Sequence, residues 1–237
     1  MTEQAFEDIG ILETPKRAPA TRAVRPRHAA TLILVRRDAA KPQVLMGRRH
    51  GRHDFMPDKW VFPGGRIDPA DYRAASANEL KPEVARRLEM TAPAARARAL
   101  ALAAVRETFE ETGLLLARPA AERAVRGPWK DFFALGAAPD LAALQFVARA
   151  ITPPLSPKRF DARFFLADAK DLVSLDRAPD CGELDEIAWV SLDEAQKLDL
   201  PSVTRFVLRE LPQRLADPER PVPSIRFTRG KQELTRL

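Results

Sequence analysis

The candidate chemistry of this chain is concentrated in Arg106-Glu107-Thr108-Phe109-Glu110-Glu111-Thr112-Gly113-Leu114, and the other elements are interpreted around this segment. At about 100° per residue in an α-helix, its three glutamates fall within one arc roughly 100° wide, whereas the apolar side chains around them point the opposite way. The acidic positions are Glu107, Glu110 and Glu111, and the apolar positions are Leu102, Val105, Phe109 and Leu116. The pattern predicts a helix with one carboxylate face and one core face.

The carboxylate face is a candidate metal site. Neighbouring carboxylates repel one another, and a divalent cation would reverse this penalty; oxygen-only ligands suit Mg²⁺ or Mn²⁺ rather than Zn²⁺. Arg106 precedes Glu110 by four residues, so we expect the two side chains to pair, and we expect Gly113 to end the helix. The alternative is an acidic helix face that only meets solvent, which is the usual meaning of an isolated E-x-x-E-E.

A second stretch, Phe62-Pro63-Gly64-Gly65-Arg66-Ile67-Asp68-Pro69, lies upstream. Together the two stretches resemble the Nudix box of nucleoside-diphosphate-X hydrolases, G-x5-E-x7-R-E-U-x-E-E-x-G-U, where U is an aliphatic residue. Gly65 matches the first glycine, and the matches to R-E, E-E and the closing G-U are Arg106-Glu107, Glu110-Glu111 and Gly113-Leu114.

The chain departs from the box in three places. Arg106 lies 41 residues after Gly65, where the box allows 14. Asp71 replaces the first glutamate, and Phe109 takes the aliphatic position. Coenzyme A diphosphatases, a branch of the family, also carry a long insertion inside the box. The segment 151–167 is similar to the T-P…S-P-x-R-F-D-T-R-F-F sequence of that branch.

The resemblance implies an α/β fold, specifically a Nudix-type α/β/α sandwich with a mixed central sheet and a helical insertion. It implies a hydrolase that cleaves the pyrophosphate bond of a small-molecule nucleoside diphosphate with Mg²⁺ or Mn²⁺. The expected metal ligands are Glu107, Glu110, Glu111 and Gly65, and the expected catalytic residues are Glu107, Arg106 and Glu110. Coenzyme A or acyl-CoA is the first choice of substrate, ahead of ADP-ribose, NADH and other nucleotide sugars or dinucleotides.

Candidate substrate-binding residues lie outside the box. Arg159 and Arg163 lie in or beside a predicted strand at 163–166, where they could hold phosphates. Arg48 belongs to a further coenzyme A motif that this chain matches only in part. The alternative is a surface loop whose arginines pair with nearby aspartates.

Nudix enzymes often place one more carboxylate in a loop outside the box. Glu183 and Glu186 are the candidates here, since they precede a predicted strand that could bring them near the acidic helix. Either residue could equally be an ordinary loop acid.

Composition excludes several classes of protein and site. The single Cys181 and three histidines exclude an internal disulfide, a cysteine zinc site and an HExxH pair. No apolar run is long enough for a membrane span, and no signal pattern opens the chain, so we expect a cytoplasmic protein. The net charge of +6 suits polyphosphate anions or a solvated arginine-rich surface. Two alternatives come from other classes. One is a non-catalytic nucleotide- or RNA-binding Nudix-like module, against which the complete R-E-x-x-E-E argues. The other is a basic nucleic-acid-binding protein in which the three glutamates are incidental.

The domain organisation is expected to be an N-terminal arm at 1–28, a Nudix domain at 29–211 with an insertion at about 72–97, and a C-terminal tail at 212–237. The predicted strands include 29–35, 43–49 and 60–62, and 141–150 is either helix or strand. Helices are predicted over 81–90, from about Ala94 through the box, and from Pro201. The insertion could serve as a lid over the substrate site or as a contact in a homodimer, and the sequence does not decide between the two.

Overall fold

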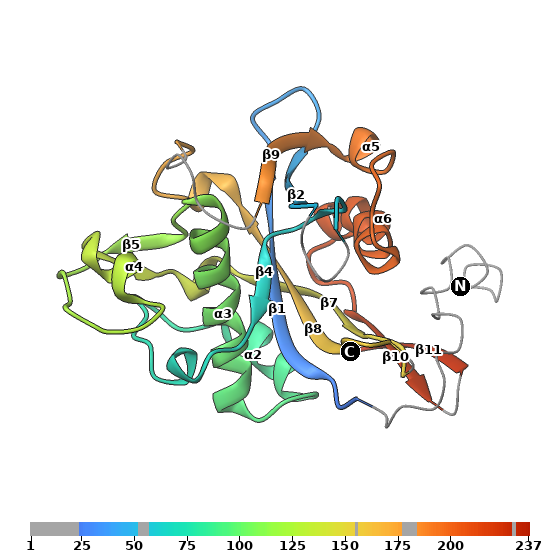
Figure 1. Ribbon diagram of the computed structural model, residues 1–237, viewed down its shortest axis with the longest axis horizontal. Helices are drawn as coiled ribbons and strands as arrows, with labels where there is room; N and C mark the ends of the chain where they lie inside the picture. The colour runs from blue at the N-terminus through green and yellow to red at the C-terminus, as the bar shows by residue number, and fades with distance from the viewer. Residues whose placement is uncertain (1–23, 52–56, 155, 177–183, 229–230) are drawn as a thin grey trace.

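The computed structural model describes residues 24–51, 57–154, 156–176, 184–228 and 231–237, and these form one mixed sheet between two layers of helices (Figure 1). The strand order is β11-β10-β7-β8-β1-β2-β3, with β4 also on β1 and β9 also on β2. The strands are β1 (Arg27–Arg36), β2 (Gln43–Arg49), β3 (Trp60–Val61), β4 (Gly64–Arg66), β7 (Gln145–Ile151), β8 (Phe160–Asp168), β9 (Leu184–Ser191), β10 (Pro223–Thr228) and β11 (Lys231–Arg236); β5 (Ala117–Pro119) and β6 (Ala137–Pro139) form a separate small sheet.

Helices cover both faces of the sheet, which confirms the predicted sandwich. One side carries α2 (Pro82–Glu89), α3 (Ala94–Thr112) and α4 (Lys130–Ala134), and the other carries α5 (Leu192–Ala195) and α6 (Ser202–Ala216) (Figure 1). Short 3-10 turns occur at Pro69–Tyr72, Leu141–Ala143 and Ala169–Asp171. Among the described helices, none combines the length and the apolarity that crossing a bilayer requires.

The central strand β1 explains why its sequence is apolar without alternation. Leu32 and Leu34 pack into the core beneath α3, whereas Ile33 and Val35 pack into the core beneath α6. A strand with helices on both faces buries every side chain, so it has no polar face. The expected hairpin with β2 is present, with Val35 opposite Val44.

The helix α3 carries the acidic stretch and begins and ends where the sequence predicts. Pro93 precedes its first turn, and Gly113 ends it with a φ of 74°, donating its N–H to the carbonyl of Phe109 at 2.8 Å. The ring of Phe109 packs edge-on against Phe132 of α4, with centroids 5.2 Å apart. An aromatic residue therefore fits the aliphatic position of the box because α4 supplies a ring beside it.

The C-terminal residues form part of the domain, so the expected tail at 212–237 is wrong. The last helix, α6, continues to Ala216, and β10 then pairs in parallel with β7, placing Ile225 opposite Ala150. Both Val222 and Ile225 are fully buried. At the other end β1 already begins at Arg27, and the remainder of the expected arm, 1–23, lies outside the described residues.

Candidate active site

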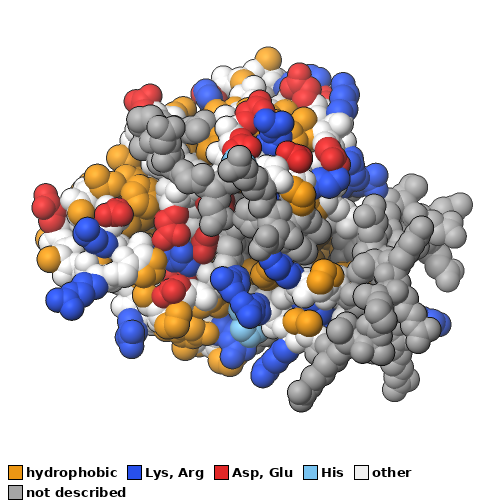
Figure 2. All heavy atoms as spheres, viewed as in Figure 1, with side chains coloured by type: hydrophobic (Ala, Val, Ile, Leu, Met, Phe, Trp, Pro, Cys, Tyr) orange, Lys and Arg blue, Asp and Glu red, His pale blue; other side chains and the backbone are white. Residues whose placement is uncertain are grey.

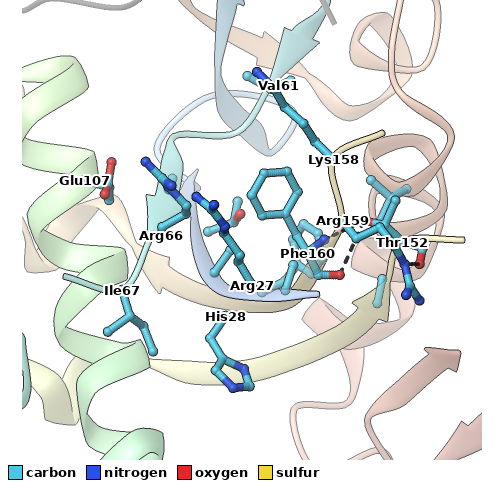
Figure 3. A pocket seen from close by; sticks show the side chains of 18 of the residues that line it. Arg27, His28, Val61, Arg66, Ile67, Glu107, Thr152, Lys158, Arg159 and Phe160 are labelled. Carbon is cyan, nitrogen blue, oxygen red and sulfur yellow. Dashed lines mark hydrogen bonds between the residues drawn. The ribbon is translucent and has the colours of Figure 1, made fainter. Parts of the chain in front are cut away.

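A pocket of about 1660 Å³ opens on the sheet between the acidic face of α3 and the start of α6 (Figure 3). Its walls come from β4, from the first half of β1, from the start of β8 with the loop before it, and from residues 201–204. Glu107 and Glu111 line it from α3, and Arg159 lines it from the loop. The acidic stretch and the segment at 151–167, far apart in the sequence, thus face the same cavity.

The backbone of the two glycines of β4 lies directly against the acidic face of α3. The N–H of Gly64 donates to Oε2 of Glu111 at 3.0 Å. A methyl group at Gly65 would overlap the carboxylate of Glu107, so only glycine allows this approach. Gly64 and Gly65 therefore lie directly against Glu111 and Glu107 of the box, although 41 positions separate Gly65 from Arg106 in the sequence.

The guanidinium of Arg106 positions the carboxylates of the site through ion pairs. Its Nη1 lies 2.9 Å from Oε1 of Glu107 and 2.9 Å from Oε2 of Glu110, as the four-residue spacing predicts for Glu110. Its Nε and Nη2 bind the two carboxylate oxygens of Asp71 at 2.9 and 3.0 Å, and Nη2 also donates to the carbonyl of Arg66. One buried guanidinium thus fixes three acidic side chains and the strand beside them.

Burial shifts the protonation of this acidic face. Loss of water around Glu107 raises the pKa of its carboxyl group to about 7, although the charge of Arg106 acts in the opposite direction. Burial likewise raises the pKa of Glu110, again opposed by Arg106. The raised pKa values mean that the surrounding protein offsets only part of the cost of burying the negative charge of these two carboxylates.

The chemistry of these donors suits a hard divalent cation. Glu107, Glu110, Glu111 and the Gly65 carbonyl offer only oxygen, and the desolvated carboxylate of Glu107 would gain from a nearby cation. Within the part of the chain that the structure describes, no group of three or more His, Cys, Asp or Glu side chains is gathered as a ready metal site. In the structure Arg106 contacts Glu107 and Glu110, while the Gly64 amide donates to Glu111.

The other candidate residues are not all placed at the pocket. Arg159 lines it, with its guanidinium donating to the carbonyls of Thr152 and Val24 at 3.1 and 2.8 Å. Arg48 and Glu186 face each other on paired strands with Nε and Oε2 3.6 Å apart, and neither lines the pocket. Glu183 lies outside the described residues.

Arg163 is buried beneath the sheet and does not reach the pocket. Its side chain has no exposed surface, and Nη1 lies 2.5 Å from Oδ1 of Asp161. Its Nη2 donates to the carbonyl of Thr91 at 3.1 Å, which ties the loop between α2 and α3 to the sheet. The expected substrate role is therefore wrong for Arg163, because alternation along β8 points its side chain to the α3 face, whereas the β8 residues that line the pocket, Phe160, Ala162 and Phe164, point to the other face.

The insertion does not cover the pocket in this structure. Of the expected insertion at 72–97, Tyr72 at its first position lines the cavity, and no residue from 73 to 97 does. Instead Val84 and Leu88 of α2 are buried in the core beneath α3. The insertion thus contributes a supporting helix, and the expectation of a lid is not met.

Several residues at the site were not singled out by the sequence. Asp71 is completely buried and accepts hydrogen bonds from Arg106 and from Nε1 of Trp129 at 2.9 Å. Arg27 and Arg66 line the pocket. The only signal for Asp71 was its place in the box, and Arg27 lay in the expected arm, where nothing in the local pattern distinguished it.

Comparison with known proteins agrees with this geometry. No protein-family model matches the chain. The crystal structure of a Nudix hydrolase from Alicyclobacillus acidocaldarius superposes with a TM-score of 0.59 and 29% identity, covering 78% of this chain and 90% of that one. The chain is 27% identical to nudix hydrolase 7 of Caenorhabditis elegans over 79% of its own length and 61% of that protein's.

A second curated relative is the acyl-coenzyme A diphosphatase NUDT19 of Xenopus laevis, 33% identical over 98 residues, which cover 32% of this chain and 26% of that protein. The chain thus spans less than two thirds of the length of either curated relative. The box residues brought together around Gly65, the sandwich fold and these likenesses agree: the chain belongs to the Nudix hydrolase superfamily.

Proposed function

We propose that this chain is a metal-dependent hydrolase that cleaves the pyrophosphate bond of a nucleoside-diphosphate-X compound, with coenzyme A or acyl-CoA as the first choice. The observation that carries the proposal is the contact of Glu107 and Glu111 with Gly64 and Gly65 at the edge of a cavity lined by arginines. Carboxylates beside cations are what a diphosphate and its metal ion together require.

The size of the cavity favours a long substrate. Its volume of about 1660 Å³ exceeds the 300–1,000 Å³ typical of sites for small ligands. Its walls also combine cations with the apolar side chains of Val61, Phe62, Phe164 and Val203. A molecule with a charged diphosphate centre and an extended organic arm matches this lining better than a free mononucleotide does. The similarity to an acyl-coenzyme A diphosphatase supports the same choice.

In the proposed reaction, water attacks one phosphorus of the diphosphate, the bridging P–O bond breaks, and two phosphate monoesters leave. Glu107, Glu110, Glu111 and the Gly65 carbonyl would hold a divalent cation, which would neutralise charge on the diphosphate and make the attacking water more acidic. Arg106 fixes Oε1 of Glu107, so that Oε2, turned towards Gly65, is placed to accept the proton of the water. Arg159 contributes positive charge at the opposite wall.

The test is a turnover screen of the purified chain with Mg²⁺ or Mn²⁺. Coenzyme A, an acyl-CoA, ADP-ribose, NADH, diadenosine polyphosphates and nucleoside triphosphates are incubated separately, and the phosphate monoesters are separated by chromatography. We expect cleavage that stops in excess EDTA, with the coenzyme A compounds giving the highest kcat/KM. Cleavage of another diphosphate alone would contradict the substrate choice, and no cleavage of any diphosphate would contradict the hydrolase.

A further inference from the structure

The floor of the pocket carries two arginines that the reaction above does not use. Arg66 on β4 is opposite Ala29 of β1, and Arg27 lies two residues before Ala29, so alternation puts both side chains on the same face of the sheet. Figure 3 shows the two guanidinium groups pointing into the pocket side by side, with Glu107 beyond Arg66. Both side chains belong to exposed residues.

Neither of these guanidinium groups has a protein partner among the described residues. The side chains of Arg27 and Arg66 make no hydrogen bond or ion pair there, although Asp68, Glu107 and Glu111 line the same pocket. Like charges side by side repel each other, and the repulsion is relieved by an anion placed between them. Arginine also presents its donors in a fork that matches phosphate oxygens. The pair therefore has the chemistry of a phosphate subsite.

The position of Arg27 separates this part of the pocket from the scissile diphosphate. Gly65, which Glu107 contacts, is opposite Ala30 of β1. Arg27 lies three residues from Ala30, which is about 10 Å along an extended strand. A phosphate bound by Arg27 is therefore a different group from the diphosphate held at the glutamates, although both can belong to one substrate.

The neighbour of Arg27 on the other side is aromatic. Parallel pairing of β1 with β8 puts Phe160 beside Arg27, and its ring lies in the pocket (Figure 3). From Glu107 through Arg66 and Arg27 to Phe160, the lining thus runs from carboxylates to cations to an aromatic ring. The parts of a nucleotide follow the same order when its ribose carries both a 5′-diphosphate and a second phosphate: diphosphate, ribose phosphate, base.

We propose that Arg27 and Arg66 form a second anion subsite, which recognises a phosphate monoester on the ribose of the substrate, with Phe160 beside the base. The proposal rests on the function proposed above and specifies its substrate class: ribose-phosphorylated nucleoside diphosphates. Two compounds supply this chemistry, coenzyme A through its 3′-phosphate and NADPH through its 2′-phosphate. Dephospho-coenzyme A and NADH are the matched compounds that lack it.

Binding is measured first, without turnover, by titration calorimetry of the full chain with adenosine 3′,5′-bisphosphate, adenosine 2′,5′-bisphosphate and adenosine 5′-monophosphate. We expect one bisphosphate to bind about tenfold more tightly than the monophosphate, and the position of its second phosphate identifies the source. In Arg27→Gln and Arg66→Gln this ratio should fall towards one, and Arg27→Lys should keep part of it. Arg25→Gln is the control, because Arg25 is exposed two residues away and does not line the pocket.

Turnover then separates the two proposals. For the wild type, kcat/KM for coenzyme A over dephospho-coenzyme A, or for NADPH over NADH, should be about tenfold, and Arg27→Gln should abolish the preference by weakening only the phosphorylated compound. Equal binding of bisphosphate and monophosphate by the wild type, or an unchanged ratio in Arg27→Gln, overturns the subsite while diphosphate cleavage stands. Absence of all cleavage refutes the hydrolase, whatever the binding ratio.

Discussion

The guanidinium of Arg106 and the carboxylate of Asp71 form a two-point ion pair, at 2.9 and 3.0 Å, between side chains that are 4% and 0% exposed. The residues are 35 positions apart in the sequence, and the ion pair joins Asp71, just before the insertion, to Arg106 on α3. The same guanidinium holds Glu107 and Glu110, so the fold and the acidic face depend on one side chain.

Removing the carboxylate of Asp71 should therefore destabilise the folded protein. We expect Asp71→Ala to lower the free energy of unfolding by about 3–5 kcal/mol, because it leaves the buried Arg106 partly uncompensated and the indole of Trp129 without an acceptor. Urea denaturation followed by circular dichroism measures it. Asp38→Ala is the control: it breaks the exposed pair with Arg36 and should leave the urea midpoint nearly unchanged. Equal midpoint shifts in both variants would contradict the assignment.

Exchanging the carboxylate of Glu107 for an amide should affect turnover and not folding. In Glu107→Gln we expect kcat on the best diphosphate substrate to fall by about 10²–10⁴-fold, because the amide can neither accept the proton nor bind a cation as tightly. The thermal midpoint should not fall. The matched control is Glu89→Gln on the exposed end of α2, far from the cavity lining, which should retain full kcat. A Glu107→Gln enzyme with normal kcat would exclude this residue as the proton acceptor.

Adding one methyl group at Gly65 should displace the carboxylate of Glu107. We expect Gly65→Ala to reduce kcat/KM by about 10²-fold, the cost typical of an ångström-scale misplacement of a catalytic group. Gly127→Ala provides the contrast: its methyl group would meet no atom within 4 Å, but the φ of 82° strains any side chain. That variant should lose some stability and keep its activity. The opposite pattern would show that Gly65 does not set the position of Glu107.

Acid should remove the support that Asp161 gives to the buried Arg163. Burial alone would raise the pKa of Asp161, but hydrogen bonds from Arg149 and the charge of Arg163 outweigh it and lower the pKa below the ordinary value. A carboxyl group with a lowered folded-state pKa stabilises the fold fully above its unfolded pKa of about 3.9, and this contribution is lost as the pH falls through the folded-state pKa.

Asp161→Asn should accordingly lower the free energy of unfolding by about 3–5 kcal/mol at pH 7, since Arg163 loses its buried counter-ion. The difference from wild type should begin to shrink below about pH 4, where the carboxyl group of the unfolded chain takes up a proton, and should be lost as the pH falls through the lower folded-state pKa. Urea midpoints between pH 3 and pH 7 measure this. Asp131→Asn, at an exposed position of α4, should show no such convergence. A constant difference at every pH would refute the role given to the charge of Asp161.

The sequence predicted the parts of the site whose signals are local. The start and end of α3, its acidic face and the pairing of Arg106 with Glu110 all follow from the 3.6-residue period and from spacing along one helix. These features need no information about the rest of the chain.

What the sequence could not predict depends on distant partners. Whether Arg163 faces the pocket or the core is decided by the register of β8 against β1, which a run of apolar residues does not reveal. The partnership of Asp71 with Trp129 joins residues 58 positions apart. The row formed by Arg66, Arg27 and Phe160 exists only once three strands are paired.

The hairpin of β10 and β11 completes one border of the sheet, because β10 occupies the side of β7 that β8 leaves unpaired. A protein truncated after α6 would leave main-chain N–H and C=O groups of β7 unpaired, and a strand of another chain could pair with them. It would also uncover the apolar surface around Ile225. Fragments ending near residue 217 are therefore expected to aggregate during expression even though they retain every residue of the pocket.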